Sequence, residues 1–135
     1  MIKESLLRTA RVYAALVGAM DFLTGIGLLV TPALTLQLMG AGVPANGAIV
    51  FVRLVGVFVA AVGASYLWTA RASEGVAIRT ALTLTIFFRV GAGTYAGAAV
   101  LAGWLEPAWL LVAATDLACV AVQCWFLQQG VGRET

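Results

Sequence analysis

Four long apolar runs make up most of this chain, and they constrain its fold more than any other feature. They cover about residues 10–31, 47–70, 77–103 and 107–128, and each exceeds the roughly 20 residues that a helix needs to cross a bilayer. The chain is 62% hydrophobic and 10% charged, against about 45–50% and 25% in soluble domains. The sequence therefore predicts an all-α integral membrane bundle of four transmembrane helices, forming one domain over residues 1–135.

Helix-breaking residues separate the runs. The pair Thr31-Pro32 ends the first run, and the segment 73–75 (Ser-Glu-Gly) separates the second from the third. Glu106-Pro107 begins the fourth run with a proline in the first helical turn, where its missing N–H is tolerated. The segment 33–39 is apolar but too short to cross a membrane, so we expect it to lie along the interface or to pack on the bundle.

The basic residues at the ends of the runs predict the orientation. All of them lie at the N-terminus, between the second and third runs, or at the C-terminus, and the other two loops contain none. They are Lys3, Arg8, Arg11, Arg71, Arg79 and Arg133. Because cytoplasmic loops carry the excess of Lys and Arg, both termini are expected in the cytoplasm. A bacterial cytoplasmic (inner) membrane is the expected location.

Each run also contains one ionisable residue: Asp21, Arg53, Arg89 and Asp116. Insertion scales assign about 2.5–3.5 kcal/mol to such a charge near a helix centre, so four facing lipid would cost on the order of 10 kcal/mol. We therefore expect a buried Asp/Arg network. From their depths in the runs, Asp21 is predicted to pair with Arg89 and Asp116 with Arg53, or all four to form one cluster.

Small residues share a helical face with each charge. The four stripes are Ala14, Gly18, Asp21 and Gly25; Arg53, Gly56, Ala60 and Gly63; Thr85, Arg89, Ala92 or Gly93, and Ala96; and Trp109, Ala113, Asp116, Cys119 and Gln123. Small side chains allow helix backbones to approach closely, which favours packing in lipid. Every stripe is therefore expected to face the interior of the bundle.

The charge network is open to two interpretations. It could fix the register of the helices, or it could bind a ligand in a polar pocket with Tyr95, Cys119 and Gln123 as further candidate lining residues. Arginine holds its proton in such surroundings, so it suits an anion better than a proton relay.

Several classes of function are excluded by residue types. The chain has no histidine, and its two cysteines, Cys119 and Cys124, have neither a zinc nor a redox spacing. We therefore expect no catalytic residue, no metal and no cofactor. A net charge of +2 without a clustered basic face also excludes nucleic acid as a partner.

The layout resembles small bacterial four-helix membrane proteins of the DoxX-like kind. The features that carry this resemblance are the first run ending at Pro32, the uncharged loop through Met39-Gly40, the run 51–66 with Arg53, Gly56 and Gly63, and Asp116 in the last helix. The resemblance implies an accessory subunit of a membrane redox or stress-related complex, without a catalytic centre of its own.

Three functions remain as hypotheses. The first is an accessory or structural subunit whose partners are the lipid bilayer and either a larger membrane complex or a second copy of the chain. The second is a small-solute or anion transporter or channel that uses the intramembrane charges. The third is a membrane-embedded enzyme that acts on a lipid or isoprenoid, with Asp21 or Asp116 as its acid–base group.

Overall fold

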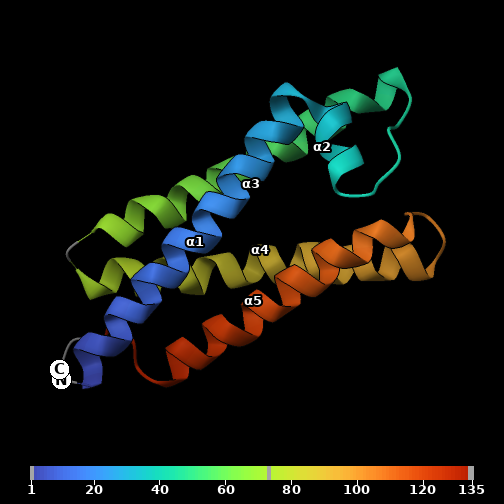
Figure 1. Cartoon of the computed structure of the whole chain (residues 1–135). Helices are drawn as coiled ribbons and strands as arrows, with labels where there is room; N and C mark the ends of the chain where they lie inside the picture. Colours follow the sequence, from blue (N-terminus) through green and yellow to red (C-terminus); the bar gives the residue numbers. More distant parts are fainter. Residues whose placement is uncertain (1, 73, 134–135) are drawn as a thin grey trace. The chain divides into compact units, whose positions relative to one another are not determined.

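The computed structural model describes residues 2–72 and 74–133, with side chains from residue 4 onward, and this part of the chain is helical without any β-strand (Figure 1). The elements are α1 (Ile2–Val30), α2 (Pro32–Leu38), α3 (Asn46–Arg71), α4 (Gly75–Leu101), the 3₁₀ turn η1 (Pro107–Trp109) and α5 (Leu110–Gln128). Four helices are long and apolar enough to cross a membrane: α1, α3, α4, and η1 continued by α5. The predicted all-α fold with four candidate spans is therefore confirmed.

The helix ends lie close to the predicted positions. Three of the four spans both begin and end within about two residues of the expected limits, and α2 has Pro32 at its first position. The largest difference is at the N-terminus, where α1 begins at Ile2 and not near residue 10. Lys, Glu and Arg are good helix formers, so the polar segment that precedes the first apolar run continues the same helix.

The contacts between helices divide the chain into two compact units. The α1–α3 unit comprises Val12–Arg71, and the α4–α5 unit comprises Met1–Arg11 together with Ala72–Thr135. The expectation of a single four-helix domain concerns the packing of these units on one another, and it stays a prediction.

In the α1–α3 unit, α1 and α3 meet backbone to backbone at glycines. A Cβ atom on Gly56 would lie 2.7 Å from the carbonyl oxygen of Gly25, and one on Gly18 would lie 2.9 Å from that of Gly63. No side chain fits at such distances, so only glycine allows this approach. Close backbone packing of this kind replaces the hydrophobic driving force that helices lack in lipid.

The short helix α2 packs inside the same unit. It contacts α3, and its Leu36 is 1% exposed. The side chain of Thr35 lies against Gly27 of α1, where a Cβ atom would be 2.7 Å from the threonine hydroxyl. The expectation that segment 33–39 packs on neighbouring helices is therefore confirmed.

In the α4–α5 unit, α4 and α5 run antiparallel and lie side by side (Figure 1). The turn between them uses Gly103 with a φ of 74°, a left-handed conformation that favours glycine. The N–H of Trp104 donates to the carbonyl of Ala99 at 2.8 Å, which closes the end of α4. Pro107 then begins η1, so the chain reverses within a few residues.

Candidate functional site

The strongest candidate site is a line of polar side chains between α4 and α5, which we name the polar seam. Its members are Thr85 and Arg89 of α4, and Asp116, Cys119 and Gln123 of α5. The spacing of four residues on α4 and of three and four on α5 places each group on one helical face. The predicted stripes of these two helices therefore face one another.

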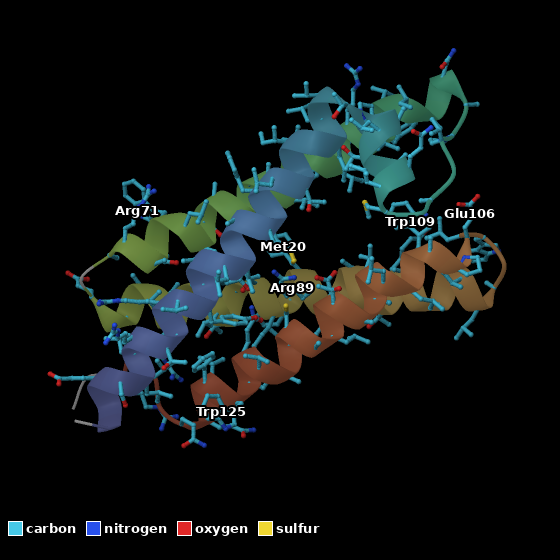
Figure 2. All side chains as sticks on the ribbon, in the orientation of Figure 1. Met20, Arg71, Arg89, Glu106, Trp109 and Trp125 are labelled. Carbon is cyan, nitrogen blue, oxygen red and sulfur yellow. The ribbon has the colours of Figure 1, made fainter. Side chains whose placement is uncertain are left out.

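An ion pair forms the centre of the polar seam. Nη1 of Arg89 donates to Oδ1 of Asp116 at 2.5 Å. The Arg89 side chain is 4% exposed and the Asp116 side chain 14% exposed. Figure 2 places Arg89 near the middle of α4, far from either end of the helix. A short, charge-assisted hydrogen bond thus links the two helices at mid-span.

A second polar contact lies nearer to the C-terminal end of α5. Nε2 of Gln123 donates to Oγ1 of Thr85 at 3.3 Å, and both residues are buried. The same hydroxyl donates to the carbonyl of Ala81 at 2.6 Å. Thr85 therefore acts as acceptor and donor at once, and the amide of Gln123 is held by a group that the α4 backbone has already oriented.

Gly93 brings the helices together beside the ion pair. A Cβ atom on Gly93 would lie 3.2 Å from Cβ of Asp116 and 3.3 Å from the carbonyl oxygen of Ala113. A larger residue at this position would require the neighbouring atoms of α5 to shift by a few tenths of an ångström. Gly93, and not Ala92, is thus the small residue on this stripe that faces α5, because Ala92 is exposed.

The structure corrects the predicted partner of Asp116. Asp116 was expected to pair with Arg53 or to join a cluster of all four charges, whereas its ion partner is Arg89 and Arg53 is exposed. The reason is the antiparallel geometry of the hairpin: Arg89 lies 14 residues before Gly103 and Asp116 lies 13 residues after it (103 − 89 and 116 − 103). Equal distances from a tight turn place two residues at the same level, a signal that the sequence contained. The predicted pairing of Asp21 with Arg89 joins the two units and stays a prediction.

Arg53 also lies elsewhere than expected. It is exposed, although Gly56, Ala60 and Gly63 of its stripe are buried. Arg53 is the eighth residue of α3, so its Cα lies only about 10 Å from the start of the helix at 1.5 Å per residue. A long arginine side chain at that depth can extend toward the interface, and it does not need an interior partner.

The other candidate residues divide between interior and surface. Asp21 is 8% exposed, on the buried face of α1 with Gly18 and Gly25. Cys119 and Gln123 are buried at 8% and 0% exposure, and their expected place in the lining of a pocket stays a prediction. Tyr95 is 64% exposed, because two residues beyond Gly93 a helix presents its opposite side, so it lies on another face of α4 than the polar seam.

Sequence reasoning missed Thr85 as a member of the site. It was recognised as part of a stripe, but its hydroxyl was not expected to accept from Gln123. The available signal was its position four residues before Arg89, which places it one turn along the same face. Within the part of the chain that the structure describes, no group of His, Cys, Asp or Glu could hold a metal ion.

Chemically, the polar seam is a neutral tie between α4 and α5. The guanidinium and carboxylate charges cancel, and the arginine holds its proton in any surroundings. In comparisons with known proteins, no family model, no curated protein and no solved structure matches the chain.

Proposed function

We propose that the protein is an accessory or structural subunit of a membrane complex, and that its intramembrane charges fix its own helices in register. The observation that carries this proposal is the direct ion pair between Arg89 and Asp116. An anion-binding arginine needs free donors aimed at its ligand. In this structure one of the two NH₂ groups of the Arg89 guanidinium already donates to the carboxylate of Asp116 in the same hairpin.

The polar contact between Thr85 and Gln123 supports the same role. It repeats the linkage of α4 to α5 on a neighbouring turn, with neutral groups in place of charges. Two links on one helix pair define both the rotation and the register of α5 against α4. The implied resemblance to DoxX-like proteins, which are associated with larger complexes, agrees with a subunit that supplies a rigid hairpin.

For the placement in the cell, we propose a bacterial cytoplasmic membrane with both termini in the cytoplasm. The support is the distribution of basic residues, since Arg8 and Arg133 lie near the termini and Arg71 and Arg79 flank the α3–α4 connection. The loops after α1 and α4 carry no Lys or Arg. Labelling of single cysteines introduced at positions 45 and 135 with a membrane-impermeant reagent tests this: label is expected only at position 45 in intact cells.

Native mass spectrometry of the protein, extracted gently from its own membrane, tests the proposed role. The expected result is a complex heavier than small multiples of 14.0 kDa, with a second protein present. The matched control is Arg89→Asp with Asp116→Arg, which reverses the pair and keeps its charge balance. It should restore the complex that each single change loses. A lone monomer or dimer under all extraction conditions would contradict the proposal.

A small-solute or anion transporter is the second candidate, and one observation favours it: Arg53 is exposed within a membrane-crossing helix. A guanidinium at that position could meet an anion that enters from the outer side. Flux of small anions into liposomes distinguishes the two functions. Flux that disappears in Arg53→Gln, while the helical content is unchanged, would replace the subunit proposal with this one.

A further inference from the structure

A cavity of about 240 Å³ lies in the α4–α5 unit, away from the polar seam. Three segments meet around it: the first turns of α1, the start of α4, and the loop that follows α5. The lining side chains that the argument uses are the charged Glu4 and Arg133 and the apolar Leu6, Leu7, Val76 and Val131. Its volume far exceeds the roughly 10–15 Å³ that holds one water, and it is somewhat smaller than the ~300 Å³ of the smallest sites for drug-sized ligands. A ligand of the size of a lipid head group suits it.

The walls of the cavity are held by specific contacts. Nη1 of Arg79 donates to the carbonyl of Val131 at 3.2 Å, and Val131 itself is 2% exposed. Gly132, with a φ of 68°, lies so close to Gly75 that a Cβ atom would overlap the Gly75 carbonyl oxygen. The loop after α5 is therefore fixed to the start of α4, and the cavity is preformed.

The depth of the cavity in a membrane follows from helix length. The candidate spans of α1 and α4 each contain 27 residues, or about 40 Å at 1.5 Å per residue. The hydrocarbon core is only about 30 Å thick, so about 10 Å of an upright helix lies outside it. The basic first turns of both helices, and not their uncharged last turns, are the ends that we expect in the layer of the lipid head groups. Arg8 and Arg79 on these turns are typical of that layer. The cavity thus opens where phospholipid head groups are the most concentrated small molecules.

The charges of the lining select among head groups. Glu4 supplies a carboxylate and Arg133 a guanidinium, and both side chains are exposed at the cavity. The other lining side chains are apolar: Leu6, Leu7, Val76 and Val131. A purely anionic head group would meet the repulsion of Glu4. A zwitterion with a phosphate and a primary ammonium matches both charges, and its ammonium can donate hydrogen bonds to a carboxylate.

We propose that this cavity binds the phosphoethanolamine head group of a phospholipid. The phosphate lies against Arg133, the ammonium lies against Glu4, and the start of the acyl region lies along Leu6, Leu7 and Val76. A choline head group satisfies the phosphate side but cannot donate to Glu4. The site is independent of the polar seam and of any role as a subunit.

The test is lipid retention by the full-length purified protein, measured by native mass spectrometry. The protein is offered equal amounts of phosphatidylethanolamine, phosphatidylglycerol and phosphatidylcholine with identical acyl chains. We expect phosphatidylethanolamine to be retained about tenfold over phosphatidylcholine, the factor of one charge-assisted hydrogen bond. In Glu4→Gln the preference should move to phosphatidylglycerol, because the repelling charge is gone, and Arg133→Gln should lose retention of both phosphatidylethanolamine and phosphatidylglycerol.

Control variants distinguish lipid binding in the cavity from non-specific attraction of lipids to the positive charges of the protein surface. Arg8→Gln removes an exposed positive charge one turn from Glu4 but outside the cavity lining, and it should retain the wild-type preference. Val76→Trp fills the cavity and should lose the lipid while circular dichroism shows unchanged helix. Equal losses in Arg8→Gln and Arg133→Gln, or retention by a folded Val76→Trp, would overturn the proposal. Retention of soluble phosphoethanolamine as tightly as of the lipid would overturn the assignment to a membrane lipid.

Discussion

The two helix pairs of this protein are held together in opposite ways. In the α1–α3 unit, the helices touch through glycine backbones, with Gly25 against Gly56 and Gly18 against Gly63. In the α4–α5 unit, the contact runs through side chains, with an ion pair at mid-span and an amide–hydroxyl bond one turn away. In the second pair, the comparable approach is at Gly93. A Cβ atom there would lie 3.2–3.3 Å from atoms of α5, farther than a Cβ atom on the α1 and α3 glycines would lie from the facing helix.

The difference teaches how a short chain can specify neighbouring helices in a medium without a hydrophobic driving force. Shape complementarity at glycines gives many weak contacts, which any added atom destroys. Polar ties give a few stronger contacts, which tolerate some displacement but require both partners. The two units should therefore fail under different substitutions, and four predictions test this.

The largest effect is expected from removing one member of the ion pair. Asp116→Ala removes the carboxylate that accepts from Nη1 of Arg89, and breaking a buried pair by removing one member costs about 3–5 kcal/mol. The free energy of unfolding can be measured by SDS titration followed by circular dichroism. Hydrogen exchange should locate the loss in α4 and α5.

The matched control removes both charges. Arg89→Met combined with Asp116→Leu exchanges the pair for apolar side chains, which is often neutral or stabilising. The double variant should therefore be more stable than Asp116→Ala alone. If both lose the same stability, the ion pair is not the tie between α4 and α5.

The second effect concerns the glycine contact. A Cβ atom on Gly63 would overlap the backbone nitrogen of Phe22, and a backbone cannot move aside as a side chain can. We expect Gly63→Ala to cost about 3 kcal/mol, the upper end of the overpacking range, with faster hydrogen exchange in α1 and α3. Gly47→Ala is the control on the same helix, because nothing lies within 4 Å of its added Cβ. Gly47→Ala should therefore keep or slightly gain stability, and equal losses in the two variants would show that the close packing at Gly63 does not decide the effect.

Much of this architecture could be predicted from the sequence. The four spans follow from run length and composition, and the buried faces of α1, α4 and α5 follow from residues spaced three and four apart, such as Asp116, Cys119 and Gln123. These properties are local, since they depend only on the helical repeat and on the cost of exposing polar groups in lipid.

The properties that depend on two helices at once were harder to predict. The predicted partner of Asp116 was wrong because the depth of each charge in the membrane was estimated separately in each run. A small error in the limits of a run then shifts the estimated depth of a residue by about one helical turn. Counting outward from the Gly103 turn removes this error for the α4–α5 hairpin. Arg53 was misplaced because its stripe was extended past the glycines that contact α1, although a long side chain near a helix end has the interface within reach.

The third prediction concerns the neutral link of the polar seam. Thr85→Val keeps the shape of the side chain but removes the hydroxyl that accepts from Gln123 at 3.3 Å. Hydrogen bonds between transmembrane helices average about 0.6 kcal/mol and reach about 1.7 kcal/mol, so a loss in this range is expected by SDS titration. Thr85→Ser keeps the hydroxyl and should lose less. A loss for Thr85→Val as large as that for Asp116→Ala would contradict the ranking of charged over neutral ties.

The smallest effect on stability is expected from alanine substitutions at two glycines of the same helix. Gly91 and Gly93 both lie in α4, but nothing surrounds the Cβ position of Gly91, whereas that of Gly93 lies 3.2 Å from Cβ of Asp116. Alanine is favoured over glycine in a helix by up to about 1 kcal/mol, so Gly91→Ala should gain stability within that limit. Gly93→Ala gains the same propensity but must displace α5 at the ion pair, so its net change should be a loss. If both variants gain equally under SDS titration, α5 yields freely at Gly93, and the polar contacts alone hold this hairpin together.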